Sequence, residues 1–387
     1  MWWKRRTYLD AAAGIRGNPS SPHEEGRRAK KALEDARTDI ARLLEVQSDD
    51  VIFTSGATES NALAILGHLR ALRLQERPDA PGRNNMHILY LPSAHASVAE
   101  NMKLLAAEGV SVEALPVKDA RVDVDALAKL MRKETVLVSM DAVCGETGVV
   151  WNTREVAEIL RKSGTRVLLH VDASQAPFTE KMTSAHFDAD LLTLDGAKVG
   201  PRGVGILVAH RTIPLAPLYG GGGQERGLRS GSEAPELARA FAAALTAAAQ
   251  GREKFRAAAA RERARLAESI AKAVPNIQMN EGRARHTGSV AGRAQAPNIL
   301  NISLPGRDTD YLVALLDEAG FAVSTRSACE TDSEEGSRAV FSLFGDRERA
   351  RATLRISWGP GIRHRELDRF AEALMRSIAF IDSSASR

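Results

Sequence analysis

The chain has 387 residues, enough for two domains, and its 44% hydrophobic and 26% charged residues are typical of globular proteins. The formal net charge of +4 is small and the arginines are spread along helical stretches, which argues against the clustered basic surface of a nucleic-acid-binding protein. Two distant cysteines give neither a disulfide framework nor a zinc motif, and we see no signal peptide or membrane-spanning run, so we expect a cytoplasmic protein without membrane contact.

Up to about residue 210 the chain alternates between helical and strand patterns. A helical pattern starts at Ser21-Pro22, and apolar residues then recur at helical spacing as far as Leu44. Further helices are predicted at 57–74, 122–132 and 152–164. Short strands rich in Val, Leu and Ile are predicted at 50–56, 87–92, 111–117, 135–143, 166–174, 189–198 and 203–209. This alternation predicts an α/β fold with a mostly parallel sheet and helices on both faces.

The rest of the chain has a different pattern. Residues 233–274 are rich in Ala and Arg with helical spacing broken near Gly251, which predicts two helices or one long kinked helix. Strands are then predicted at 298–304, 321–327 and 351–359, and helices at 308–320 and 364–381. We therefore predict a large domain at 15–250 and a smaller α+β domain formed by 1–14 and 251–387.

Two charged residues follow predicted strands. Asp172 ends the apolar run of LLHVDASQ, at the carboxyl edge where open α/β sheets bind ligands. A carboxylate there needs a cationic or N–H partner, such as a protonated pyridine nitrogen, and Gln175 is close enough to reach the same ligand. Lys198 follows the strand of LLTLDGAK. Taken singly, Lys198 is better interpreted as a lysine of a surface turn, and an aspartate that follows a strand is commonly just a helix cap.

Three further segments have the composition of binding loops. In FTSGATESN a strand, a turn and a helix follow one another, so the amides of Gly56 and Ala57 and the hydroxyl of Thr58 can bind a phosphate. His95 lies on a loop after the next strand. The segment YGGGGQERGLRSGSEAP, which contains Ser232, has four successive glycines that allow close backbone approach to another surface.

The two cysteines differ in context. Cys329 heads the polar run ACETDSEEGS, whereas Cys144 lies beside an apolar strand, and we interpret Cys144 as structural. A thiol on a polar loop is either an incidental small residue or a nucleophile, and a nucleophile has to be deprotonated.

In their order and separation these motifs resemble the cysteine desulfurases, the NifS/IscS group of fold-type I, class V pyridoxal-phosphate enzymes. The matching segments are GNPSSPH, FTSGATESN, HVDASQ, GPRGVG, GGGQERGLRSGS and TRSAC. The resemblance extends over nearly the whole chain. It implies a large domain that binds pyridoxal 5'-phosphate and a smaller C-terminal α+β domain that carries the Cys329 loop.

The resemblance also implies roles for individual residues. Lys198 would hold the cofactor as a Schiff base, Asp172 would pair with the pyridinium nitrogen, and His95 would stack on the ring and transfer protons. The remaining cofactor contacts would come from Gln175, Gly56, Ala57, Thr58 and, across a subunit boundary, Ser232. Arg355 would bind the substrate carboxylate with its guanidinium fork. Cys329 would accept the sulfur of L-cysteine as a persulfide.

Partners follow from the same resemblance. We expect a homodimer with shared sites and a sulfur-acceptor protein, either an iron–sulfur scaffold or a sulfur carrier for tRNA thiolation. Two alternatives stay open. One is a related lyase acting on selenocysteine or cysteine sulfinate, and the other is a non-catalytic scaffold for sulfur transfer.

The sequence also departs from the family pattern. Only Gly14, Ile15 and Arg16 separate TYLDAAA from GNPSSPH. From the resemblance we would expect about twenty residues more at this point. Asp195 and Ala197 replace a serine and a histidine that help to bind phosphate, so we expect the Asp195 side chain to turn away. Gly145 replaces a side-chain amide, and one residue is missing after Lys198. The sequence therefore indicates a divergent member.

Overall fold

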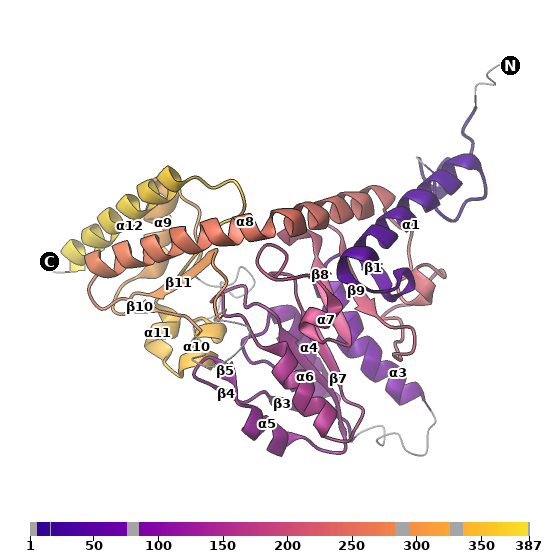
Figure 1. Cartoon of the computed structure of the whole chain (residues 1–387), viewed down its shortest axis with the longest axis horizontal. Helices are drawn as coiled ribbons and strands as arrows, with labels where there is room; N and C mark the ends of the chain where they lie inside the picture. Colours follow the sequence, from indigo (N-terminus) through magenta and orange to yellow (C-terminus); the bar gives the residue numbers. More distant parts are fainter. Residues whose placement is uncertain (1–5, 16, 76–84, 283–293, 326–335, 386–387) are drawn as a thin grey trace.

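The computed structural model describes residues 6–15, 17–75, 85–282, 294–325 and 336–385. These residues form a large body around a seven-stranded sheet and a smaller one around a three-stranded sheet (Figure 1). A single long helix, α8 (Pro235–Ala273), runs along both bodies. The fold is thus built from two cores that share one helix.

The large sheet confirms the α/β prediction. Its strands, in spatial order, are β1 (Val51–Thr54), β9 (Gly205–Ala209), β8 (Leu191–Asp195), β7 (Leu168–Asp172), β6 (Thr135–Asp141), β2 (His87–Tyr90) and β3 (Ser111–Ala114). Pairing is parallel from β8 to β3, while β9 is antiparallel to both β8 and β1. Because β9 is antiparallel to both of its neighbours, β1 points the same way as β8. Every strand except β9 therefore ends at the same edge of the sheet.

Helices cover both faces of this sheet, since every residue of β1, β6, β7 and β9 is buried. The helices and short turns of the large body are η1 (Ala11–Ala13), α1 (Glu24–Leu44), η2 (Ser48–Asp50), α2 (Ala57–Ala62), η3 (Leu63–Gly67), α3 (His68–Leu74), α4 (Ala96–Ala107), α5 (Val124–Leu130), α6 (Thr153–Lys162), α7 (Ser184–Phe187), η4 (Gly196–Lys198) and η5 (Glu225–Gly227). A small hairpin pairs β4 (Val117–Lys118) with β5 (Arg121–Val122). The predicted helix over 57–74 is confirmed as α2, a π-helical turn and α3 in succession.

The smaller body is α+β. It contains the antiparallel strands β10 (Gln278–Met279), β11 (Ile299–Ser303) and β12 (Thr353–Ser357), with the helices α9 (Thr309–Glu318), α10 (Arg338–Phe344), α11 (Arg347–Arg351) and α12 (His364–Ala385). The strand predicted at 321–327 is wrong over its described part, which makes only a bridge between Ser324 and Arg355. Val323 and Phe321 still pack on the second core, which explains the apolar pattern without a strand.

Helix α8 is continuous, so the break predicted near Gly251 is wrong. Phe241 and Leu245 on its first half belong to the large core, and Leu266 and Ile270 on its second half belong to the small core. The helix stability lost at one glycine is smaller than the stabilisation that the burial of these two apolar faces provides. The domain boundary at residue 250 stays a prediction. No helix within the described ranges is both long and apolar enough to cross a membrane.

We expect Gly251→Ala to raise the free energy of unfolding by about 0.5–1 kcal/mol, because glycine is a poor residue in a helix interior. Position 251 is exposed, and an added Cβ would meet no atom within 4 Å. Urea unfolding of the two proteins at equal concentration measures the difference. A fall in stability would show that the helix needs the freedom of a glycine at this point.

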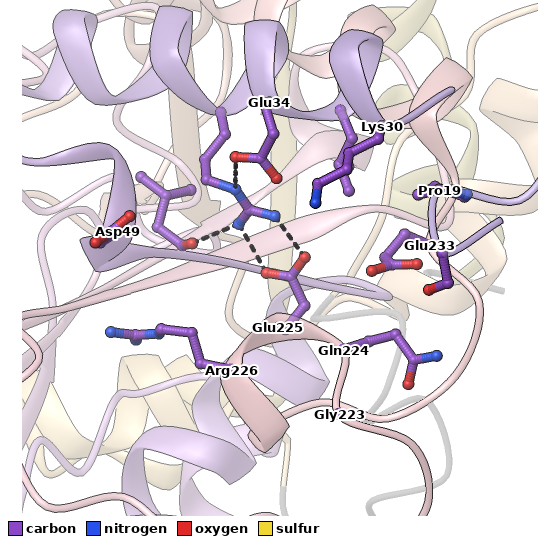
Figure 2. Close-up of a pocket in the computed structure, with 13 residues that line it drawn as sticks. Pro19, Lys30, Glu34, Asp49, Gly223, Gln224, Glu225, Arg226 and Glu233 are labelled. Carbon is purple, nitrogen blue, oxygen red and sulfur yellow. Dashed lines mark hydrogen bonds and ion pairs between the residues drawn. The ribbon is translucent and has the colours of Figure 1, made fainter. Parts of the chain in front are cut away.

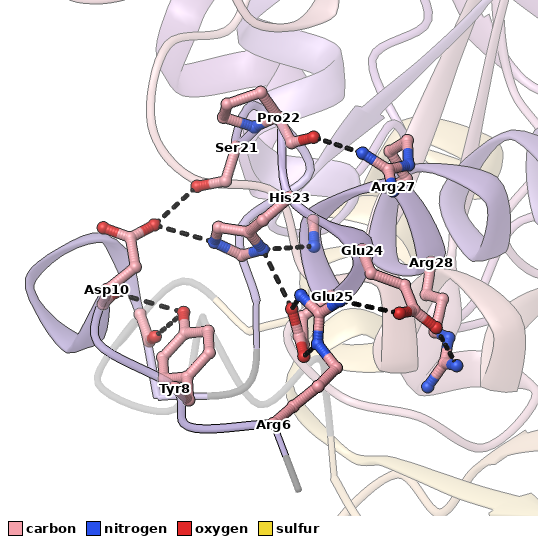
Figure 3. A network of polar contacts seen from close by, with 12 residues as sticks. Arg6, Tyr8, Asp10, Ser21, Pro22, His23, Glu24, Glu25, Arg27 and Arg28 are labelled. Atoms are coloured by element: carbon pink, nitrogen blue, oxygen red, sulfur yellow. Dashed lines mark hydrogen bonds and ion pairs between the residues drawn. The ribbon is translucent and has the colours of Figure 1, made fainter. Parts of the chain in front are cut away.

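The N-terminal residues contact α1, as Figure 3 shows. Asp10 accepts hydrogen bonds from Ser21 Oγ (2.9 Å) and lies 3.0 Å from His23 Nε2, while Arg6 pairs with Glu25. We predicted residues 1–14 to join the small domain. Those described, 6–14, instead lie at the opposite end of the molecule from the small body (Figure 1), where Asp10 and Arg6 contact residues at the start of α1.

Candidate active site

Five strands bring predicted cofactor-binding residues of the large body, and Gly145 beside them, to one edge of the sheet. Gly56 follows β1, Lys198 follows β8, Asp172 ends β7, Gly145 follows β6 and His95 follows β2. These strands all point the same way, so their carboxyl ends meet. Such an edge is where open α/β sheets bind ligands.

Asp172 is buried, with 7% of its surface exposed, and both of its carboxylate oxygens accept hydrogen bonds. Oδ2 accepts from Asn61 Nδ2 at 2.7 Å, and Oδ1 accepts from the backbone N–H of Ser174 at 3.0 Å. A buried carboxylate requires such donors. Asp172 therefore lies in a site that already stabilises its charge.

His95 is linked to Asp172 through two side chains that we did not predict. Its Nδ1 lies 2.9 Å from Ser97 Oγ and accepts from the backbone N–H of Ser97 at 3.2 Å. Ser97 Oγ in turn accepts from Asn61 Nδ2 at 2.9 Å. Asn61 was detectable in the sequence, because it occupies the same helical stripe as the apolar residues Ala64 and Ile65.

A second buried carboxyl group, also missed, lies beside Asp172. Asp141 is its register partner at the end of β6, so the two side chains lie on the same face of the sheet. Burial, and next the negative charge of Asp172, raise the pKa of Asp141 well above its ordinary value, against the opposing charge of Arg338 and a backbone hydrogen bond from His95. The Asp141 carboxyl group is therefore harder to ionise than an exposed aspartate.

Gln175, Gly145 and Arg355 also lie together. A Cβ on Gly145 would lie only 2.8 Å from Gln175 Nε2, so the glutamine amide occupies the space beside this glycine. Arg355 donates from Nη1 to the Gly145 carbonyl oxygen at 3.2 Å. The small body thus contributes one side chain to the carboxyl edge of the large sheet.

The turn at Gly56 has the geometry of an anion site with one exception. Gly56 adopts a φ of 152° and precedes α2, whose first N–H groups have no partner within the helix. The Asp195 side chain does not turn away as expected, because its Oδ1 lies 3.6 Å from the Cβ position of Gly56. It caps the next turn, accepting from the backbone N–H of Ala197 at 3.1 Å.

Lys198 lies on the short helical turn η4, directly after β8. The turn is fixed by Gly196, because a Cβ there would lie 2.5 Å from the Pro201 carbonyl oxygen. The lysine is exposed and makes no hydrogen bond or ion pair with any described residue.

The glycine-rich loop is anchored by a buried ion pair. Glu225 accepts from Arg37 Nη2 at 2.7 Å, with side chains only 2% and 10% exposed, and from the Phe53 N–H at 2.8 Å. Glu225 lines a pocket of about 290 Å³ between α1 and this loop. Figure 2 shows its carboxylate facing the guanidinium of α1. Glu225 and Arg226 both have left-handed backbones, with φ of 48° and 61°, which this pair holds in place.

Ser232, on the same loop, is exposed and accepts from Asn18 Nδ2 at 3.4 Å. A second contact holds the loop against the Gly56 turn, since Arg229 Nε donates to Glu59 Oε1 at 3.1 Å. Although burial opposes it, hydrogen bonds from Tyr219 and Ser55 keep the pKa of Glu59 below its ordinary value. Glu59 is thus a charged link between turn and loop.

Cys329 lies outside the described residues, but both ends of its segment are fixed to the small body. Thr353 Oγ1 donates to the carbonyl oxygen of Thr325, and Ser337 N donates to that of Ala350 at 2.8 Å. Arg338 then donates to the carbonyl oxygen of Ala94, beside His95, at 2.8 Å. The described residues that flank the segment are thus fixed, Thr325 to β12 and Arg338 to the histidine loop.

Cys144 is a different kind of thiol. It is 1% exposed, and burial followed by the charge of Asp141 raises its pKa to about 11. A thiol of this pKa is almost fully protonated at neutral pH and is a poor nucleophile. The structure agrees with the interpretation of Cys144 as structural.

The sheet and the polar residues at its carboxyl edge define an α/β protein with a candidate ligand site at that edge. The chain belongs to the aminotransferase class-V family, whose family model matches residues 7–370.

Individual relatives are similar over most of their length. Cysteine desulfurase IscS 1 of Archaeoglobus fulgidus is 33% identical over 362 residues, which cover 92% of this chain and 88% of that protein. A solved NifS-like protein is 28% identical with a TM-score of 0.82, covering 94% of this chain and 92% of the other. SspA, solved in complex with cysteine, is 27% identical with a TM-score of 0.71, covering 89% of this chain and 91% of the other.

Proposed function

We propose that this chain is a cysteine desulfurase that uses pyridoxal 5'-phosphate to convert L-cysteine to L-alanine and leaves the sulfur on Cys329. The observation that carries the proposal is the meeting of Lys198, Asp172 and His95 at one sheet edge in a chain whose relatives are named cysteine desulfurases. A relative solved with cysteine supports the substrate.

The residues present fit the cofactor. Bound pyridoxal phosphate supplies an electron sink for cleaving bonds to the substrate's carbon atoms. Lys198, which has no described partner, would bind it covalently, and Asp172 would face its ring nitrogen. Gln175 would contact its phenolic oxygen, and its amide lies in the space where the family amide at position 145 is missing. His95 would lie on the ring and transfer protons.

Phosphate binding depends on the Gly56 turn. Its donors would be the amides of Gly56 and Ala57 and the hydroxyl of Thr58, with Ser232 of a second subunit added in a homodimer. The carboxylate of Asp195 beside this turn weakens the site for a dianion. We propose that the partner loop and the helix N-terminus offset that repulsion.

Arg355 and Cys329 would act on the substrate. Arg355 would bind the α-carboxylate of L-cysteine, which fits its position beside Gly145 at the junction of the two bodies. The Cys329 thiolate would attack the substrate sulfur, so that a sulfur–sulfur bond forms, the carbon–sulfur bond breaks and a proton replaces sulfur on the β-carbon. The products are alanine and a Cys329 persulfide.

We expect Gly145→Ala to raise the dissociation constant of pyridoxal phosphate by roughly 3–10-fold, the equivalent of one lost hydrogen bond. The new methyl group would displace the end of the Gln175 side chain, which lies 2.8 Å from its position. Fluorescence titration of the cofactor-free protein measures the change. Gly251→Ala, which adds a methyl group where no atom lies within 4 Å, is the control.

We expect Cys329→Ala to abolish sulfide release from cysteine while cofactor binding is kept. Cys144→Ala is the matched control and should keep most of the activity, because the Cys144 thiol is buried and protonated. Sulfide and alanine are both measured. Alanine production by Cys329→Ala from selenocysteine or cysteine sulfinate would instead indicate the related lyase, and a wild-type protein that binds no cofactor would indicate a scaffold.

The assembly remains part of the proposal. We propose a cytoplasmic homodimer that passes sulfur to an iron–sulfur scaffold or to a sulfur carrier. The exposed Ser232 on a loop fixed by Glu225 supports the shared site, because a residue that reaches a second subunit has to project from a rigid base.

A further inference from the structure

We propose that Asn61 and Ser97 are positioning residues. They connect the hydrogen-bond-accepting carboxylate of Asp172 to His95 through successive hydrogen bonds, and so hold the imidazole of His95 with its proton on Nε2. The four side chains form one chain of hydrogen bonds from the end of β7, through α2 and the start of α4, to the histidine loop. The importance of these hydrogen bonds for catalysis depends on the proposed function, whereas the tautomer of His95 does not depend on it.

The direction of the chain is set at Asp172. Both of its oxygens accept from N–H groups, so the atom of Asn61 that lies 2.7 Å from Oδ2 has to be the donor Nδ2. With the amide reversed, two oxygens would face each other at that distance. Asn61 Oδ1 consequently lies buried without a hydrogen-bond partner among the described residues, a cost that the two N–H contacts offset.

The second N–H of the same amide fixes Ser97. Asn61 Nδ2 lies 2.9 Å from Ser97 Oγ, and Asn61 and Ser97 are 0% and 8% exposed. Ser97 Oγ therefore accepts from Asn61, and its own hydrogen is left to donate elsewhere. The neighbour within reach is His95 Nδ1, at 2.9 Å.

His95 Nδ1 then has two donors. It receives the Ser97 hydroxyl and also the Ser97 backbone N–H at 3.2 Å, as the side-chain cap of α4. A nitrogen that accepts two hydrogen bonds carries no proton, so the neutral ring has its proton on Nε2. Any group of cofactor or substrate that meets Nε2 thus meets an N–H donor.

The matched control lies in the same loop. Ser93 is buried, at 6% exposed, and its hydroxyl has no hydrogen-bond partner among the described residues. Ser93→Ala therefore removes the same atom as Ser97→Ala, two residues from His95 on the other side, without touching the chain. Asp172→Asn tests whether the effect passes along these hydrogen bonds, because an asparagine at position 172 would allow the Asn61 amide to reverse.

Nitrogen NMR of the full-length protein labelled on its histidine side chains provides the test, with and without added pyridoxal phosphate, and His95→Gln assigns the signal. We expect a directly bonded proton at Nε2 and none at Nδ1 in the wild type and in Ser93→Ala. In Ser97→Ala and Asp172→Asn a protonated Nδ1 form should become detectable.

A wild-type spectrum with the proton on Nδ1 overturns the inference, and it does so without any variant that has to fold. So do spectra of Ser97→Ala and Asp172→Asn that match the wild type. Failure of the proposed function is a separate result, seen as absent cofactor binding or absent sulfide release, and the spectrum of the cofactor-free protein is informative in either case.

Discussion

Lys198→Ala is expected to lower cysteine turnover by at least roughly 10²–10⁴-fold, the contribution of a positioned proton-transferring group, and to abolish covalent retention of pyridoxal phosphate. Lys198 lies on a short turn at the carboxyl edge, and no described residue engages its amine. The variant should fold, because its side chain is exposed. Borohydride reduction followed by peptide mass spectrometry locates the covalent bond directly.

The comparison variant for this experiment is Lys103→Ala. Lys103 is an exposed lysine of α4, the helix that His95 caps, and it pairs only with Glu100 at 2.7 Å among the described residues. After borohydride reduction, Lys103→Ala should carry the cofactor on Lys198, as the wild type does. A reduced cofactor found on another lysine, or full activity of Lys198→Ala, would refute the assignment of Lys198.

Glu225→Gln is expected to lower the free energy of unfolding by about 3–5 kcal/mol, since it leaves the charge of Arg37 buried without its partner. Glu225 also accepts the Phe53 N–H of β1 and holds two left-handed residues of the glycine-rich loop. Urea unfolding monitored by circular dichroism, at one protein concentration for all variants, measures the change.

Asp35→Asn is the control, on the helix that carries Arg37. It breaks the pair of Lys31 and Asp35, whose side chains are 74% and 58% exposed, and should change stability by less than about 1 kcal/mol. If Glu225→Gln cost no more than this exposed pair, the anchoring of the loop by Glu225 would be disproved.

The fold of the large body could be predicted because its strands are buried on both faces. A strand such as β7, with all five positions buried, has to be uniformly apolar up to the charged residue that ends it. The prediction failed where local signals competed with packing. Gly251 lowers helix propensity, yet α8 continues because it has apolar partners on both sides of that position.

The candidate site could be predicted only for residues that follow a strand and belong to a recognisable sequence motif. Asp172, His95 and Lys198 stand at strand ends and are visible as polar residues after apolar runs. Asn61 lies inside a helix, where its function depends on the side chains that face it. Asp141 ends β6 as Asp172 ends β7, but its role depends on the register that places the two side by side. Asp195 was expected to turn away from the Gly56 turn, but its role as a cap for Ala197 keeps it there.

The rod formed by α8 has a mechanical consequence. Its first half packs into the core of the large body and its second half into the core of the small body. The helix is continuous from one half to the other. A hinge between the bodies would have to bend this rod, so any closure over a reactant falls to the connecting loops. The two bodies should accordingly melt as a single cooperative unit.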